Sequence, residues 1–133
     1  ILLKNKADIN LQSGLGRCTA LMWASMRGHL DVVRILLENK ADGSNALPIA
    51  AFNGHLDMVY MLLENKVDVN FQSEIGQTAL MEASNRGHLA VVNRLLDCKQ
   101  IDVNVQNKVS GIVDFITSHI QNSLPIFFGC VFN

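Results

Sequence analysis

The sequence predicts an all-α solenoid of stacked antiparallel helix pairs, because one block of residues occurs three times. The run from Thr19 to Asp42 returns as Asn45 to Asp68 and, with one inserted residue, as Thr78 to Asp102. Each run holds a short apolar segment, a Gly-His pair and a second apolar segment. The second and third Gly-His pairs are 33 residues apart, and a fixed period of roughly 20 to 50 residues is typical of repeat architectures.

A first helix is expected to begin at the Thr that opens a block. The hydroxyl groups of Thr19 and Thr78 can accept a hydrogen bond from an unpaired backbone N–H of the first turn. Small residues at mid-helix allow two helices to approach closely, and they are Ala24-Ser25, Ala50-Ala51 and Ala83-Ser84. Glycine adopts the left-handed conformation at little cost, so the first helices should end at Gly28, Gly54 and Gly87.

A second helix is expected from about Leu30 to Asn39 and at the equivalent positions of the other blocks. Its polar residues Asp31, Arg34 and Glu38 fall at i, i+3 and i+7, which places them in one narrow stripe. Almost all of its other residues are apolar. Such a helix must be covered on several sides, which stacked neighbouring repeats can do and a single partner helix cannot.

Asp and Asn residues, which favour turns, occur between the helix pairs in residues 8–10, 68–70 and 102–104. The segment 78–83 reads T-A-L-M-E-A and departs from the ankyrin signature T-P-L-H-x-A only at the Pro and the His. Over about residues 2–107 the chain therefore resembles the ankyrin-repeat family. The resemblance implies an ankyrin-repeat solenoid with hairpin fingers that open at the Asp-x-Asn segments. It also implies a hydrogen bond from each Gly-His histidine to the backbone at the turn.

On this basis the chain divides into five segments. Residues 1–13 are the end of a truncated preceding repeat, and residues 14–44, 45–74 and 75–107 are three ankyrin repeats. Residues 108–133 are an atypical apolar tail.

The finger after the first full repeat is shortened. Gly28 and Gly54 are only 26 residues apart, seven short of the 33-residue period. The segment from Asp42 to Asn45 leaves no room for a full finger. Either this finger is naturally deleted, or an exposed loop tip is missing from the sequence. The Gly and Ser residues of the segment favour the second interpretation.

A lysine replaces the glycine that the family carries after the second helix. Lys6, Lys40 and Lys66 occupy this position. Either these lysines adopt a positive φ at a cost of about 1 kcal/mol each, or the asparagine before each lysine takes over the left-handed conformation.

The tail departs from the repeat pattern. Residues 109–133 hold one charged side chain, Asp114, and four of the six Phe residues of the chain. Apolar residues permit one amphipathic helix packed on the last repeat, and they are Ile112, Val113, Phe115, Ile116 and Ile120. Alternatively, the codons for Lys108-Val109-Ser110 can match a splice-donor consensus, and the tail is then translated intron.

The composition disfavours several classes of partner. The formal net charge is −1, whereas binding to nucleic acid or anionic lipid depends on an excess of clustered Lys and Arg. No stretch approaches the roughly 20 apolar residues that a membrane span needs. Three Cys residues without a C-x-x-C spacing argue against a disulfide framework and structural zinc. They fit a reducing compartment, and we expect a cytoplasmic or nuclear protein.

No catalytic constellation, cofactor, metal site or small-molecule substrate is expected. The Gly-His histidines lie about one repeat apart, so they should not converge on a zinc ion at bonds of roughly 2.0 to 2.3 Å. The acidic residues of the second helices occupy equivalent solvated positions in successive repeats. Neither Cys18 nor Cys98 lies in a nucleophile motif, and no glycine-rich phosphate loop follows a strand.

A protein-binding surface remains. Partner contact in ankyrin repeats falls mainly on the fingers and on the concave side of the first helices, and the resemblance assigns it to Arg17, Trp23, Met26, Arg27, Ile49, Phe52, Asn53, Glu82, Asn85 and Arg86. Trp23 could equally be a core residue, whereas exposure is favoured for Met26 and Phe52. We expect a non-catalytic protein-protein interaction module. The alternative is a targeting or regulatory segment of a larger enzyme or channel.

Overall fold

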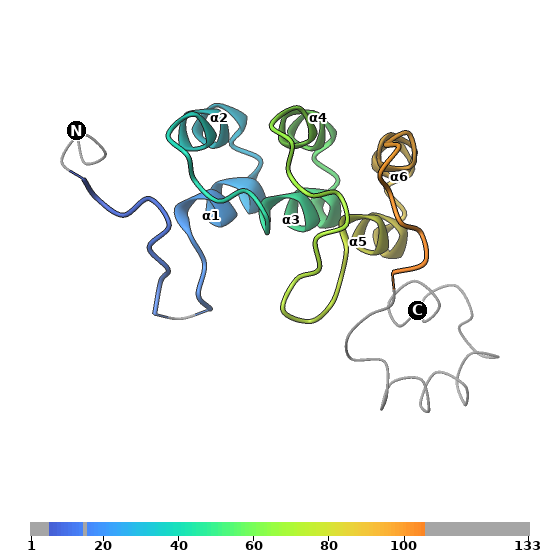
Figure 1. Cartoon of the computed structure of the whole chain (residues 1–133), viewed down its shortest axis with the longest axis horizontal. Coiled ribbons are helices and arrows are strands. Elements are labelled where there is room, and N and C mark those ends of the chain that lie inside the picture. The colour runs from blue at the N-terminus through green and yellow to red at the C-terminus, as the bar shows by residue number, and fades with distance from the viewer. Residues whose placement is uncertain (1–5, 15, 106–133) are drawn as a thin grey trace.

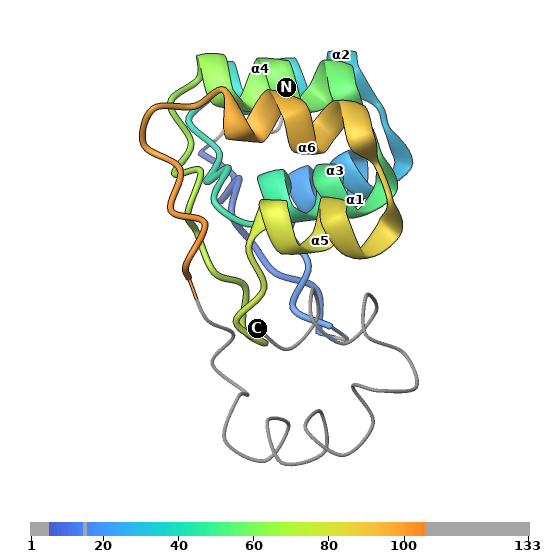
Figure 2. The same ribbon diagram turned by 90° about the vertical axis from the view of Figure 1, so that its right-hand side faces the viewer.

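The chain forms three antiparallel helix pairs. The structure, a computed structural model, describes residues 6–14 and 16–105. Within these residues there are six helices and no strand: α1 (Ala20–Arg27), α2 (Leu30–Glu38), α3 (Ala46–Asn53), α4 (Leu56–Glu64), α5 (Ala79–Arg86) and α6 (Leu89–Leu96). Figure 1 shows the first helices of the pairs in one row and the second helices in another, and the end-on view in Figure 2 shows the two layers. The predicted all-α stack is confirmed, while the predictions for the tail lie outside the described residues.

The first helices begin and end where the sequence predicts. The Thr19 hydroxyl accepts a hydrogen bond from the Met22 backbone N–H at 3.2 Å, and Thr78 caps α5 in the same way. Each first helix ends at a glycine in the left-handed region, with φ of 76°, 72° and 72° at Gly28, Gly54 and Gly87. The chain reverses at these glycines and enters the second helix two residues later.

Small side chains bring the first helices together. The central helix α3 contacts both α1 and α5. Its residues Ala46, Leu47, Ala50 and Ala51 are completely buried. Ser25 of α1 is buried as well, and its hydroxyl donates to the Leu21 carbonyl at 2.8 Å. The predicted close approach of the helices at their small residues is therefore confirmed.

Two histidines join one repeat to the next. His55 Nε2 lies 3.4 Å from the Met26 carbonyl oxygen, and His88 Nε2 lies 3.0 Å from the Phe52 carbonyl oxygen. The resemblance implies such a bond for all three Gly-His histidines. The structure shows it for His55 and His88, while the His29 side chain forms none with the described residues. Each imidazole also covers the glycine that ends the preceding first helix, because a Cβ added at Gly54 would lie 2.7 Å from His88 Nδ1.

Asparagine side chains link successive connections. Asn10 Oδ1 accepts a hydrogen bond from the Asp42 backbone N–H at 2.8 Å, and Asn70 Oδ1 accepts one from the Asp102 N–H at 2.7 Å. Asn70 Nδ2 also donates to the Gln100 carbonyl at 2.6 Å. The Asp-x-Asn segments therefore form turns that also hold neighbouring repeats together.

Two loops project from the stack beside the first helices (Figure 1). Residues 10–14 and 16–18 form the first loop, which a hydrogen bond from the Ser13 N–H to the Cys18 carbonyl closes. Residues 70–77 form the second loop, which the equivalent bond from Ser73 to Gln77 closes. The connection between α2 and α3 carries no such loop.

The connection from α2 to α3 is short and well packed. The Ser44 N–H and hydroxyl both donate to Asp42 Oδ1, at 3.0 Å and 2.6 Å. These two hydrogen bonds lower the pKa of Asp42 below its usual range, and the one from the hydroxyl has the larger effect. Gly43 is buried, and a Cβ there would lie 3.0 Å from a Val67 methyl carbon. Residues 39–45 therefore join α2 directly to α3.

The lysines after the second helices adopt the left-handed conformation. The φ angles are 62° at Lys6, 67° at Lys40 and 58° at Lys66. The preceding asparagines make a different contribution, because the side-chain amides of Asn39 and Asn65 donate to the Ile35 and Met61 carbonyls at 2.8 Å. Of the two alternatives that the sequence left open, the positive φ at lysine is correct.

The second helices are covered less evenly than the sequence predicts. Met58, Val59 and Leu62 of the middle helix α4 are buried, as expected. In α2, however, Val32 and Ile35 are exposed. The reason is position in the stack, because no described helix packs on the outer side of α2.

Gly54 has a left-handed backbone conformation and also leaves room for the His88 ring, and comparison with Gly87 separates these two roles. Both have φ of 72°, but no described atom lies within 4 Å of a Cβ added at Gly87. We expect Gly87→Ala to cost about 1 kcal/mol of unfolding free energy, from the backbone alone. Gly54→Ala should cost about 2 kcal/mol, because His88 must also move and lose its hydrogen bond. Urea unfolding measures both values, and equal losses would contradict the proposed contact between histidine and glycine.

Removing the strained lysine conformation should stabilise the chain. We expect Lys66→Gly to raise the free energy of unfolding by about 0.5 to 1 kcal/mol, because glycine takes a positive φ without the steric cost. Lys99→Gly is the matched control, since Lys99 is also exposed and is not among the residues with positive φ. Thermal unfolding compares the two, and a gain from Lys99→Gly equal to that from Lys66→Gly would contradict the explanation.

Candidate functional site

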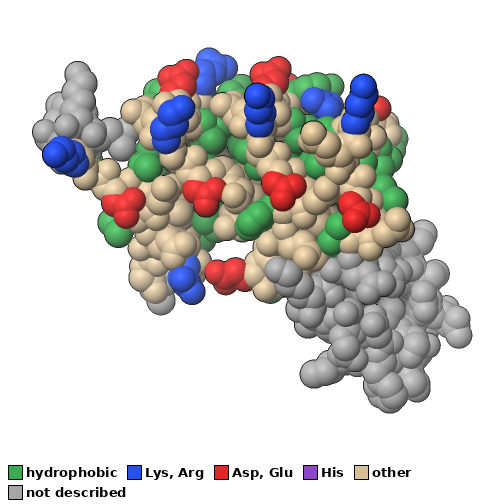
Figure 3. All heavy atoms as spheres, in the orientation of Figure 1, with side chains coloured by type: hydrophobic (Ala, Val, Ile, Leu, Met, Phe, Trp, Pro, Cys, Tyr) green, Lys and Arg blue, Asp and Glu red, His purple; other side chains and the backbone are tan. Residues whose placement is uncertain are grey.

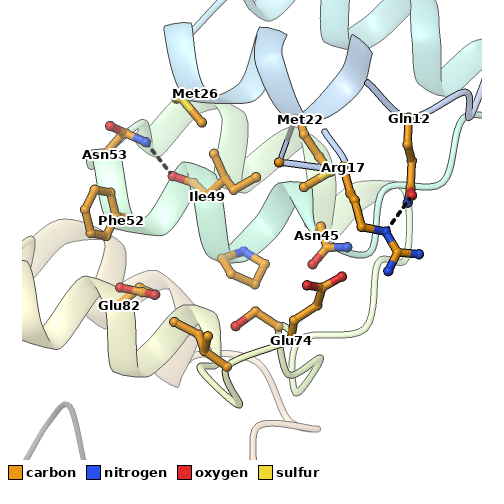
Figure 4. Close-up of a pocket in the computed structure, with 14 residues that line it drawn as sticks. Gln12, Arg17, Met22, Met26, Asn45, Ile49, Phe52, Asn53, Glu74 and Glu82 are labelled. Carbon is orange, nitrogen blue, oxygen red and sulfur yellow. Dashed lines mark hydrogen bonds between the residues drawn. The ribbon is translucent and has the colours of Figure 1, made fainter. Parts of the chain in front are cut away.

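A groove with a volume of about 410 Å³ lies against α3, on the side where the two loops project. Side chains of α1, α3, α5 and both loops line it. Figure 3 shows the hollow between the two loops, and Figure 4 shows the side chains around it. Its floor is formed by Asn45, the residue before α3, and by Pro48 and Ile49 in the N-terminal half of that helix.

The groove brings together six of the ten residues that the resemblance assigned to partner binding. These are Arg17, Met26, Ile49, Phe52, Asn53 and Glu82. The other four do not line it: Trp23, Arg27, Asn85 and Arg86. Among those four, Arg86 still contributes, because its guanidinium carbon lies 3.8 Å from the centre of the Phe52 ring.

Eight lining residues were not identified from the sequence, and they are Gln12, Gly16, Met22, Asn45, Pro48, Ser73, Glu74 and Ile75. Five of them belong to the two loops, so they reach the groove only because no loop stands between them. The short spacing between Gly28 and Gly54 is the sequence signal that could have indicated this. A missing loop uncovers the start of the helix behind it.

Three apolar side chains on this side differ in exposure. Trp23 is 47% exposed and Met26 is 38% exposed, while Phe52 is half-buried. Trp23 is therefore a surface residue and not a core residue, two roles between which the sequence could not decide. The exposure favoured for Met26 is confirmed, and that of Phe52 is only partial because Arg86 stacks on its ring.

One end of the groove is formed by Phe52 and Glu82, from neighbouring helices (Figure 4). Glu82 is half-buried, and loss of hydration raises the pKa of its carboxyl group above the usual value. The positive charge of Arg86 offsets part of this effect. The Asn53 side chain is held by donating to the Ile49 carbonyl at 2.9 Å. This end combines an aromatic ring with a partly dehydrated carboxylate.

The other end of the groove lies between the loops. Arg17 belongs to the first loop, and its Nε donates to Gln12 Oε1 at 3.2 Å. Arg17 also has a positive φ of 50°, after Gly16 at 81°. Glu74 and Ile75 of the second loop lie on the opposite side and are exposed, Ile75 at 59%. An exposed apolar side chain and charges of both signs therefore surround this end.

Features typical of other functions are not found in the described part of the chain. Residues 6–14 and 16–105 contain no group of three or more His, Cys, Asp or Glu residues that could hold a metal ion. No helix within the same ranges has the length and apolar character to cross a bilayer. Cys18 and Cys98 are free thiols.

Comparison with known families identifies the repeats. A family described as ankyrin repeats (3 copies) matches residues 1–73 and also residues 39–107, so that the two overlapping matches cover most of the chain. Comparison with curated proteins gave no significant match.

The raised pKa of Glu82 predicts a stabilising substitution. We expect Glu82→Gln to raise the midpoint of thermal unfolding at pH 7, because it removes a carboxylate that folding partly dehydrates. The carboxyl binds its proton more tightly in the folded state, so folding gains stability as the pH falls. The advantage of Glu82→Gln should therefore shrink as the pH falls and vanish below the ordinary value of 4.5. Thermal unfolding from pH 7 to pH 4 tests this.

Glu74→Gln is the matched control for that series, because Glu74 also lines the groove but is exposed. Its effect on the unfolding free energy should stay within about 0.5 kcal/mol. A destabilised Glu82→Gln protein at pH 7 would show that the carboxylate is instead a stabilising partner.

Proposed function

Because the chain belongs to the ankyrin-repeat family, whose members are generally protein-protein interaction modules and typically non-catalytic, we propose that it binds a protein partner in the groove. The proposed contact surface consists of the groove residues of the two loops together with Arg17, Trp23, Met26, Arg27, Ile49, Phe52, Asn53, Glu82, Asn85 and Arg86. The proposal includes no chemical reaction at this surface. The partner is held by shape, apolar contact and charge.

The observation that carries this proposal is the exposure of apolar side chains around an open groove. Trp23, Met26 and Ile75 are exposed, although other apolar residues of the chain form a buried core. Aromatic residues, Met and Arg are enriched at the centres of protein interfaces. Contiguous apolar surface with a polar rim marks a binding site more often than isolated apolar side chains do.

The carboxylates of the second helices take no part in the groove. Asp31, Glu38, Asp57 and Glu64 are all exposed on the second helices, away from the groove. Asp31 Oδ1 lies 3.7 Å from Arg34 Nη1, and both of these side chains are largely exposed. Exposed pairs of this kind contribute at most about 1 kcal/mol to stability.

Position-specific crosslinking identifies the partner and tests the surface. A photoreactive phenylalanine analogue replaces Met26 in the groove, and a second variant carries it at Tyr60, which is exposed on α4. We expect one protein to crosslink from position 26 and not from position 60. Equal capture from both positions would contradict the proposed surface.

The captured partner then allows a comparison of Phe52 with Leu62. Phe52→Ala should weaken binding by more than about 1 kcal/mol, as at an interface hot spot, with an unchanged helical circular dichroism spectrum. Leu62 is completely buried, so Leu62→Ala should cost about 2 to 5 kcal/mol of folding stability. If Phe52→Ala unfolds the chain as severely as Leu62→Ala, Phe52 is a core residue and the proposal fails there.

A further inference from the structure

The outer side of α2 carries a residue that is buried in the other second helices. Val32 of α2 corresponds, position by position, to Met58 of α4 and Val91 of α6. Met58 and Val91 are 1% exposed, whereas Val32 is 47% exposed. The second helices are in contact along the stack, from α2 to α4 and from α4 to α6. Met58 and Val91 are therefore covered by a preceding helix pair, which Val32 does not have in the described part of the chain.

The first helices show the same difference. Ala46 and Ala79 are buried, whereas Ala20 stands at the equivalent position of α1 and is exposed. The outer side of the first pair thus continues the surface that forms the two buried junctions of the stack. We call this surface the N-terminal face, and it consists of Ala20, His29, Val32 and Ile35.

His29 adds a polar feature to the N-terminal face. At the two junctions, His55 Nε2 lies 3.4 Å from the Met26 carbonyl oxygen and His88 Nε2 lies 3.0 Å from that of Phe52. In both cases the carbonyl is two residues before the glycine that ends the preceding first helix, and the ring covers this glycine. The His29 side chain forms no such bond with a described residue. The face therefore fits a helix that ends in glycine.

Residues 6–10 show where that helix pair joins the chain. Lys6 has a φ of 62°, and Lys66, which follows α4, has a φ of 58°. Asn10 Oδ1 accepts a hydrogen bond from the backbone of the next connection, as Asn70 Oδ1 does. The backbone of residues 6–10 therefore has the geometry of a segment that follows a second helix.

The sequence before Lys6 agrees with this position. Residues 1–8 differ from residues 35–42 only at Lys4, where Glu38 is the counterpart. Residues 35–38 are the last turn of α2. A helix pair on the N-terminal face would thus lead into Lys6 on the same polypeptide. A second copy of the chain does not fit, because its residues 100–104 would need the place that residues 6–10 occupy.

From these observations we infer that the N-terminal face is a docking surface for one further helix pair of the same polypeptide, N-terminal to Lys6. The first helix of this pair ends in a glycine that the His29 ring covers. His29 Nε2 donates to the backbone carbonyl two residues before that glycine, and Val32 and Ile35 pack on the pair. This inference does not depend on the groove or on its partner.

The test adds a helix pair to the full 133-residue chain. A copy of residues 19–34 is fused before Ile1, so that it continues into residues 1–8 as the original continues into residues 35–42. We expect the midpoint of thermal unfolding to rise by at least about 8 °C, because neighbouring pairs of a solenoid stabilise each other. An unchanged midpoint would overturn the inference.

Val32→Glu distinguishes contact at the face from a general gain in stability. In the 133-residue chain Val32 is exposed, so the substitution should change the midpoint by no more than about 3 °C. In the fused chain it should remove at least half of the gain, because the charged side chain is then buried. Leu89→Glu is the matched control, since Leu89 is 70% exposed on α6, and its effect should be the same in both chains. Equal effects of Val32→Glu in the two chains would overturn the inference.

His29→Ala tests the hydrogen bond in the same pair of chains. It should leave the midpoint of the 133-residue chain nearly unchanged, because His29 makes no side-chain capping bond there. In the fused chain it should lower the midpoint by about 4 °C or more, since a hydrogen bond is lost. The same small effect in both chains would show that His29 does not hold the added pair.

Other occupants of the face give different results. If analytical ultracentrifugation shows a dimer of the 133-residue chain that Val32→Glu dissociates, a second copy covers the face and the inference is overturned. It is also overturned if a photoreactive residue at position 35 captures the same protein as one at position 26. Phe52→Ala should leave the gain from the fused pair unchanged, so the proposed function can fail while this inference stands.

Discussion

Contact between neighbouring helix pairs holds the molecule together, because no pair can bury its apolar residues alone. The central helix α3 makes this clear, since its small residues are buried between α1 and α5. Large side chains at Ala50 and Ala51 would force the helices apart. The histidine of each following pair then fixes the position of the preceding one by covering its terminal glycine. Packing of this kind leaves the loop side of the first helices free.

The same contacts explain why the loops and the groove can vary. The asparagine bonds that join successive turns begin at Asn10 and Asn70, at the base of each loop rather than at its tip. A repeat can therefore lack a loop while the helices behind it stay in register. The connection through Gly43 shows this arrangement, since it is packed against Leu37 and Val67 of the neighbouring elements. The groove is the surface consequence.

Much of the fold could be predicted from the sequence because its signals are local. A threonine before an apolar segment, a Gly-His pair and a regular period each depend on a few adjacent residues. The conformation at Lys40 and Lys66 could not be predicted, because asparagine and lysine compete for the same role. The structure resolves it through the amide of Asn39, which bonds back to Ile35 and leaves the left-handed position to lysine.

The candidate site was only partly predictable for a different reason. The helix residues Met26 and Phe52 could be assigned from the resemblance to ankyrin repeats, since the equivalent helix positions repeat along the chain. Pro48 and Ile75 could not, because they meet across a position where the loop is absent, which is a tertiary effect. Exposure at Trp23 likewise depends on what packs outside α1. Residues whose role depends on a neighbour that is missing leave no periodic signal in the sequence.

The most direct test of the groove as the binding surface is a methyl NMR titration, in which the protein partner that crosslinks from position 26 is added to the chain. The account predicts that the methyl signals of Met26, Ile49 and Ile75 shift together. The signals of Ile35 and Leu89, which are exposed on second helices, should stay in place. Shifts confined to Ile35 and Leu89 would show that partners bind the other side of the stack and would contradict the account.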